Sequence, residues 1–182
     1  MRNDFLYASI TDAQGTIRSI DVRAGFLFVV LFLPLSMLDK IWVIYGFPAR
    51  PSKVMTGWIV VDLLIWALAI VALFNCVAAI DDPTRHIRGA AGKGSFYGGD
   101  LFNLSSAHIF FNLATQSKRS VGEEKDTLPK NDNELETELV YEKIKLIYIR
   151  TIKIKRFTAA ARLTVIWLVS SGALAIYTKF IA

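Results

Sequence analysis

The stretch WIVVDLLIWALAIVALFNCVAAI (residues 58–80) decides the fold class of this 182-residue chain. Its 23 residues carry one charge, on Asp62. About 20 mostly apolar residues are enough for a helix to cross the hydrocarbon core of a bilayer. The whole chain is 53% hydrophobic, which is common for a membrane protein that also has a polar part. The stretch therefore predicts an all-α membrane protein.

Two further apolar runs extend this prediction. Residues 158–182 have sufficient length, and Arg162 lies near one end of the run, where a long side chain can reach the interface. Residues 24–38 follow a mostly polar arm and reach spanning length only if the helix continues further. Pro34 should bend that helix. We expect spans at about residues 24–45, 58–80 and 158–181.

Positive charge is concentrated between the second and third spans. Residues 81–157 hold 13 of the 21 Lys and Arg residues. The positive-inside rule places this segment in the cytoplasm, and we expect a multi-pass membrane protein. The net charge of +5 fits an anionic membrane surface or ligand, and we expect no nucleic acid partner. The single cysteine, Cys76, excludes a disulfide framework and a cysteine-based zinc site, and the two histidines are too few to predict a metal site.

The cytoplasmic segment divides into four parts. Residues 81–94 form a turn-rich connector, residues 100–115 a short apolar helix, and residues 116–133 a polar, mobile linker. Residues 134–157 form a strong helix, because apolar residues recur in it with a spacing near 3.6. The recurring residues are Val140, Ile144, Ile147, Ile154 and Thr158. Nothing breaks this helix before the third span, so we expect one rod of about 70 Å.

Three stretches resemble the membrane-spanning effectors of Pycsar antiphage defence, the PycTM-type domain family. They are SIDVRAGFLFVV (residues 19–30), SFYGGDLFNLS (residues 95–105) and KIKLIYIRTIKIKRFTAAARL (residues 143–163). The positions that match the family's motifs are Asp21, Arg23, Ala24, Gly25, Gly98 and Asp100. The chain departs from the family in carrying Arg23 where Lys is usual, and in the very polar insert at residues 116–133.

The resemblance implies a single membrane effector domain over residues 1–182 that is not an enzyme and needs no cofactor. Its activating ligand would be cyclic CMP or cyclic UMP, made by a partner nucleotidyl cyclase on phage infection. The effector would then impair the inner membrane, as a homo-oligomer in the bilayer, and cause abortive infection. These statements are implied by the resemblance; composition and spacing indicate only a membrane protein with a basic cytoplasmic segment.

Such a ligand needs cations or backbone amides for its phosphate and a flat or polar surface for its base. The first part of the cytoplasmic segment offers six candidates: Arg85, His86, Arg88, Lys93, Ser95 and Tyr97. The alternative interpretation is that the basic residues among them are only positive-inside charges at the end of a span.

Polar residues in or beside the spans have two interpretations each. Asp62 could extend to the outer interface, line a pore or pair with Arg162 or another buried cation. Asp21 could be an interfacial anchor, or it could pair with Lys153 or Arg156 and lock a resting state. Ser170, Ser171 and Gly172 could allow close helix packing, within one subunit or between subunits.

Catalytic patterns are weak in this sequence. GAAGKG (residues 89–94) looks like part of a phosphate loop, but it lacks the Walker spacing. Two other functions therefore compete with the effector. One is a non-enzymatic adaptor that recruits a soluble partner through its cytoplasmic helices. The other is a small transporter subunit, which only Asp62 and Arg162 favour.

Overall fold

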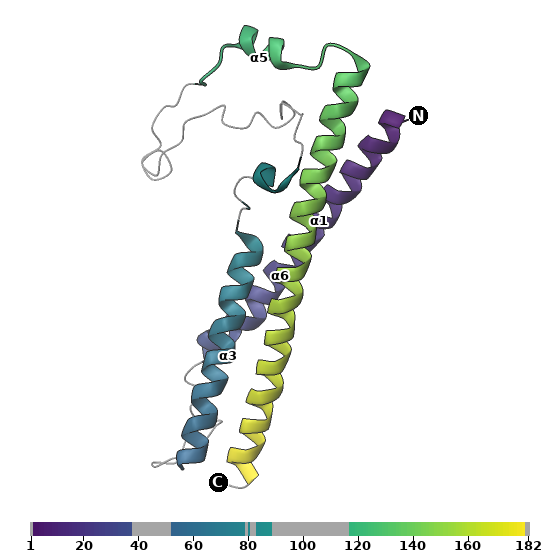
Figure 1. Ribbon diagram of the computed structural model, residues 1–182. Coiled ribbons are helices and arrows are strands. Elements are labelled where there is room, and N and C mark those ends of the chain that lie inside the picture. The colour runs from purple at the N-terminus through teal and green to yellow at the C-terminus, as the bar shows by residue number, and fades with distance from the viewer. Residues whose placement is uncertain (1, 38–51, 79, 81–82, 89–116, 181–182) are drawn as a thin grey trace. The chain divides into compact units, whose positions relative to one another are not determined.

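The structure is a computed structural model, and it describes residues 2–37, 52–78, 80, 83–88 and 117–180. These residues form helices and no strand, so the predicted all-α class is confirmed for the described part of the chain (Figure 1). In chain order the elements are α1 (Arg2–Phe32), η1 (Leu33–Met37), α3 (Lys53–Val77), η2 (Pro83–His86), α5 (Val121–Thr127) and α6 (Asp132–Phe180). The predicted helix at residues 100–115 lies outside the described residues.

Helix α1 begins 22 residues before the predicted first span, at Arg2 instead of residue 24. The arm is helical because apolar residues recur on one inward face between polar neighbours. The buried residues of α1 recur at intervals of three, four or seven positions: Leu6, Ile10, Ala13, Ile20, Ala24 and Leu31. The helix ends at Phe32, and Pro34 lies in the 3-10 turn that follows. A bend was predicted at Pro34, and the structure has a change of helix type there, because proline has no N–H to donate to the previous turn.

Helix α3 contains the stretch that decides the fold class. It begins at Lys53, five residues before the predicted start, because the Ser52 side chain caps it by accepting a hydrogen bond from the Met55 amide at 3.2 Å. Its buried positions include every seventh residue: Met55, Asp62, Ala69 and Cys76. A seven-residue repeat keeps one side of a helix on its neighbours over many turns.

Helix α6 is continuous over 49 residues, as predicted. At its start the Asn131 side chain accepts from the Glu134 amide at 2.9 Å, and Glu134 accepts from the Lys130 amide at 2.9 Å. Buried residues again recur every seven positions: Leu139, Leu146, Lys153, Ala160, Trp167 and Leu174. The apolar residues that predicted this helix lie on another face, because Val140, Ile144 and Ile154 are exposed.

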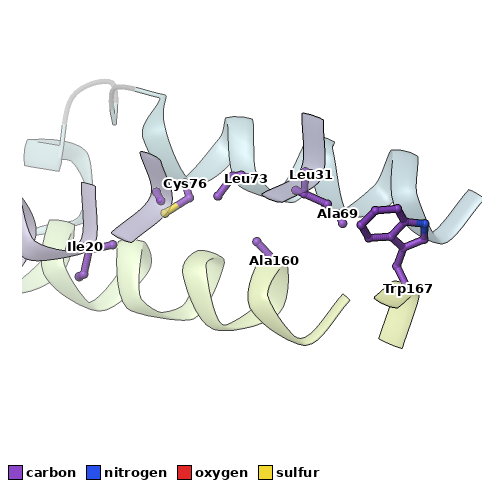
Figure 2. Close-up of a cluster of buried hydrophobic side chains, with 8 residues drawn as sticks. Ile20, Leu31, Ala69, Leu73, Cys76, Ala160 and Trp167 are labelled. Carbon is purple, nitrogen blue, oxygen red and sulfur yellow. The ribbon is translucent and has the colours of Figure 1, made fainter. Parts of the chain in front are cut away.

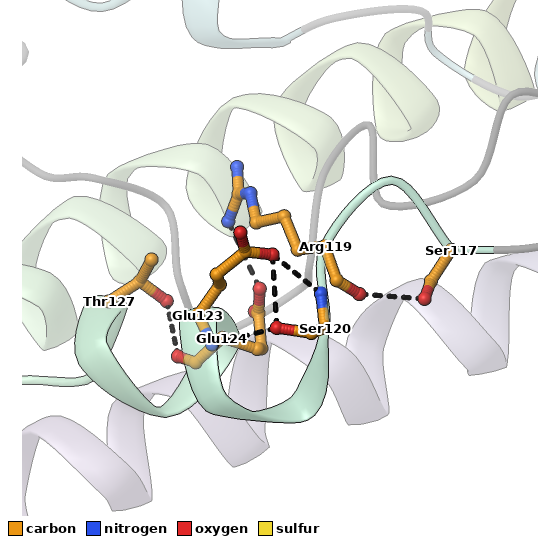
Figure 3. Close-up of polar contacts among 6 residues, drawn as sticks. All are labelled: Ser117, Arg119, Ser120, Glu123, Glu124 and Thr127. Carbon is orange, nitrogen blue, oxygen red and sulfur yellow. Dashed lines mark hydrogen bonds and ion pairs between the residues drawn. The ribbon is translucent and has the colours of Figure 1, made fainter.

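Residues 116–133 were expected to be a mobile linker, but part of them folds into α5 (Figure 3). The Ser120 hydroxyl accepts from the Glu123 amide at 3.3 Å, and Glu123 accepts from the Ser120 amide at 2.7 Å. This reciprocal arrangement is a capping box, which satisfies two backbone donors at a helix start. The polar composition had concealed the S-x-x-E signal at Ser120 and Glu123.

The chain divides into two compact units. The polar unit comprises Met1–Gln14 and Asp82–Tyr148, and the spanning unit comprises Gly15–Asp81 and Ile149–Ala182. The continuous helices α1 and α6 contribute to both. The core of the spanning unit is drawn from α1, α3 and α6 (Figure 2). Its buried members are Ile20, Ala24, Leu31, Ala69, Leu73, Cys76, Ala160 and Trp167.

Helices α1 (with η1), α3 and α6 are long and apolar enough to cross a membrane. Their outward faces are also apolar: Val60, Val61, Leu63, Leu64 and Leu68 on α3 are each more than half exposed. Such a surface is unfavourable in water and favourable against lipid chains. The described residues are therefore those of a membrane protein; residues 38–45 of the first predicted span lie outside them.

The small core residues give a test of this packing. We expect Ala160→Leu to lower the free energy of unfolding by about 2 kcal/mol, because added carbons overpack a filled site. Ala159→Leu is the matched control, since Ala159 is exposed and should change stability by less than about 0.5 kcal/mol. Unfolding of the two variants in mixed detergent measures both values, and equal stability would contradict the packing described.

Candidate functional site

An ion pair joins α1 and α6 inside the spanning unit. Lys153 Nζ lies 2.5 Å from Asp21 Oδ1, and the side chains are 10% and 40% exposed, respectively. Lys153 occupies one of the seven-residue core positions of α6, where the other residues are apolar. Because a buried ammonium loses its hydration, it needs a counter-ion at this position. The pairing is one of the two interpretations that the sequence left open for Asp21.

Two backbone contacts bring α3 to the same pair of helices. The Cys76 thiol donates to the Lys153 carbonyl at 3.7 Å, and Arg156 Nη1 donates to the Asn75 carbonyl at 2.7 Å. Asn75 is in the last turn of α3, where carbonyls have no partner within the helix and a cation is favourable. We call these residues the inner polar cluster: Asp21, Asn75, Cys76, Lys153 and Arg156.

The motif positions of the resemblance separate into inward and outward residues. Asp21 is in the inner polar cluster, and Ala24 is fully buried in the core. Arg23 and Gly25 are exposed. The other two positions, Gly98 and Asp100, lie outside the described residues.

Asp62 lies on the inward face of α3, with 8% of its surface exposed. Its Oδ2 accepts a hydrogen bond from the Ser171 hydroxyl of α6 at 2.6 Å, while Oδ1 is buried without a hydrogen-bond partner. One turn away, Trp58 Nε1 donates to the Ser170 hydroxyl at 3.0 Å. Ser170 and Ser171 thus connect helices within one subunit.

The burial of Asp62 and its contact with Ser171 bear on the three interpretations given for it above. It does not extend to the interface, because it is buried against α6. The partner that the structure gives it is Ser171, whereas Arg162 is exposed. Placing an aspartate at the centre of a membrane helix costs about 3 kcal/mol, and one hydrogen bond to a charged group returns about 1.5–3 kcal/mol. The Ser171 hydrogen bond offsets part of this cost and leaves Oδ1 buried without a partner.

Among the predicted ligand residues, His86 and Arg88 are described and exposed. The His86 ring stacks on Tyr148 of α6, with centroids 4.9 Å apart and planes 20° from parallel. The Arg85 side chain, Lys93, Ser95 and Tyr97 lie outside the described residues. Tyr148 was not predicted, since a tyrosine in an amphipathic helix gives no signal of its partner.

The polar unit also contains a buried carboxylate. Glu142 is fully buried, with Lys145 Nζ 2.5 Å from Oε1, although the approach has no hydrogen-bond geometry. Burial raises the pKa of Glu142, while Lys145 lowers it and Glu138 raises it by smaller amounts. Elsewhere in this unit Arg2 pairs with Glu136 at 2.7 Å.

Comparison with known proteins adds no family: no family model, curated protein or solved structure matches this chain. Within the described ranges, no group of three or more His, Cys, Asp or Glu side chains could hold a metal ion.

The ion pair predicts an asymmetric response to neutralisation. Asp21→Asn leaves a buried ammonium without a counter-ion, and we expect it to lower the free energy of unfolding by about 3 kcal/mol. Lys153→Met replaces the cation with an apolar side chain at a core position and leaves Asp21, which solvent can reach, so we expect a loss below about 1 kcal/mol. Unfolding of the purified variants in detergent gives both values.

Lys155→Met serves as the control, because Lys155 is exposed two residues away on the same helix. If Lys153→Met lowers the free energy of unfolding more than Asp21→Asn does, the buried ammonium does not depend on Asp21 as its counter-ion.

Glu142 predicts a pH dependence for the polar unit. Because its pKa is raised, Glu142 binds more protons in the folded state than in the unfolded state. The free energy of unfolding therefore falls as the pH rises from the pKa of the unfolded state through the higher pKa of the folded state. Glu142→Gln removes this titration, and we expect the variant to be more stable than the wild type above that window and equal to it below. Hydrogen exchange of residues 138–146 as a function of pH measures the difference. A pH profile that Glu142→Gln leaves unchanged would contradict the assignment.

Proposed function

We propose that the chain is a non-enzymatic effector of a bacterial inner membrane, activated by a cyclic pyrimidine mononucleotide and acting in antiphage defence. The observation that carries the proposal is the Asp21–Lys153 ion pair. It joins two of the three stretches on which the resemblance to Pycsar effectors rests, residues 19–30 and 143–163. Residues that a family would use together are expected to be neighbours in the fold.

The ion pair supports a switch because Lys153 is part of a helix that also belongs to the polar unit. Helix α6 is unbroken from Asp132 to Phe180. Each residue turns a helix by about 100°. A rotation of α6 by less than this angle is therefore enough to move Lys153 away from its inward position. In the proposed mechanism the resting state keeps the pair, and the ligand favours a state in which it is broken. The ligand shifts this equilibrium only by its difference in affinity for the two states.

The stacked rings in the polar unit support a place for the nucleobase. His86 is exposed and Tyr148 half-buried, and their near-parallel planes offer flat apolar surface. Stacking of a base on an aromatic side chain contributes about 1–3 kcal/mol. The exposed Arg88, two residues from His86, supplies a cation for the cyclic phosphate.

The filled core of the spanning unit supports action by several copies. Trp167, Leu31 and Leu73 occupy the interior with three buried alanines, so membrane impairment in this proposal proceeds through a homo-oligomer in the bilayer. The nucleotidyl cyclase is a partner through its product alone, and the basic residues 81–157 face the cytoplasm.

The proposal is tested by expressing the chain with a synthase for cyclic CMP or for cyclic UMP and following membrane potential with a dye. We expect depolarisation only when a cyclic pyrimidine is made, and at least about tenfold more nucleotide to be required by His86→Ala, the loss of one stacking contact. Tyr7→Ala is the control, because Tyr7 is an exposed tyrosine of the polar unit outside this stack.

Constant potential at raised nucleotide levels, with the protein present in the membrane, would refute the effector. Recovery of one stoichiometric soluble partner without depolarisation would favour the adaptor instead.

A further inference from the structure

Among the described residues of the spanning unit, Asp62 Oδ1 is the one buried side-chain oxygen without a hydrogen-bond partner. Oδ2 accepts from Ser171, but Oδ1 is enclosed without a hydrogen-bond partner. A desolvated carboxylate requires a positive charge or several donors. We propose that Asp62 is a binding site for one small monovalent cation, H⁺ or Na⁺, between α3 and α6. This inference does not depend on the proposed function.

The position of Asp62 places the site within the membrane. Trp58, four residues before it, has its indole on Ser170 and its ring 6.1 Å from Tyr177. Aromatic side chains of this kind are enriched at membrane interfaces. Four residues of helix rise about 6 Å, so Asp62 lies about one turn further into the bilayer than Trp58. Water is therefore a poor source of compensation for Oδ1.

The charged residues of the three described helices are too distant along their helices to pair with Asp62. On α6 the nearest to Ser171 are Arg162, nine residues before, and Lys179, eight residues after, or about 13 and 12 Å along the axis. On α3 the nearest is Lys53, about 13 Å from Asp62 along the axis. In α1 and η1, residues 24–37 contain no charge. The described group in contact with Asp62 is the Ser171 hydroxyl, which leaves the carboxylate's charge in place.

The two cations would use the same oxygens differently. A proton forms a covalent bond to Oδ1 and neutralises the carboxylate, while Ser171 keeps its hydrogen bond to Oδ2. A sodium ion instead takes oxygen ligands, and Oδ1 is the carboxylate oxygen that the described residues leave without a hydrogen-bond partner. Both cations allow Asp62 to remain on the buried face of α3 with its seven-residue spacing intact.

Dicyclohexylcarbodiimide tests the site directly in the full chain, purified in detergent without nucleotide. The carboxyl O–H adds across one C=N bond of the reagent, with its oxygen bonded to the central carbon and its proton transferred to nitrogen. Acyl transfer from oxygen to the other nitrogen then gives a stable N-acylurea, and no group leaves. The apolar reagent reaches membrane-embedded carboxyl groups, and mass spectrometry locates the modified residue.

A proton site predicts that Asp62 is modified and that Na⁺ leaves the rate of modification unchanged at constant ionic strength. A sodium site predicts that Na⁺ slows modification at constant ionic strength, with choline as the control cation, and that Ser171→Ala weakens this protection. Asp62→Asn is isosteric and uncharged, and should fold and remain unmodified.

The proposal is overturned if Asp62 stays unmodified from about pH 5 to 9 in a preparation whose unfolding transition is intact. It is also overturned if Asp62→Asn takes up as much reagent as the wild type. Neither result bears on nucleotide activation, which membrane potential reports separately.

Discussion

The buried ammonium of Lys153 imposes the strictest condition on this structure. It lies at a core position of α6, in line with Leu146 and Ala160, where apolar packing would be expected. A counter-ion has to meet it there, and Asp21 on α1 does so. Because an ion pair is satisfied in one register only, it fixes how α1 and α6 align within the spanning unit, which apolar contacts alone do less well. Cys76 and Arg156 then tie the end of α3 to the same level.

Small residues make this alignment possible. Ala24, Ala69 and Ala160 are fully buried on three different helices. In lipid, helix association depends on close packing, and small side chains permit it. The polar contacts lie toward the two ends of α3, with the inner polar cluster at Cys76 and the hydroxyl contacts at Trp58 and Asp62. Between them the described core is mostly apolar, and Trp66 Nε1 donates to the Leu31 carbonyl at 2.9 Å.

The features that sequence reasoning predicted are those that depend on short-range pattern. The spanning stretch of α3 and the unbroken α6 follow from length, hydropathy and the lack of helix breakers. The helical arm of α1 was missed, because its single buried residue per turn is hidden among charged neighbours. The partner of each polar side chain was harder to predict from the sequence. Lys153 and Arg156 are three residues apart on one face of α6, so both were candidates to pair with Asp21. Ser171 is 109 positions from Asp62, and only the packing of α3 on α6 reveals that contact.

Lys153 and Asp62 are both charged residues at seven-residue core positions, and the difference between them is informative. A charge that is merely tolerated in a span would turn outward near an end and extend to the interface, as the exposed Arg162 and Lys179 can. An inward charge must instead be compensated by its neighbours. Lys153 has that compensation from Asp21, so its position is explained by the described residues alone. Asp62 has a serine hydroxyl and a bare oxygen, so its position is explained only when a positive charge outside the described contacts is added. Among the described residues, the spanning unit thus pairs one of its two buried charges and leaves Oδ1 of the other without a hydrogen-bond partner.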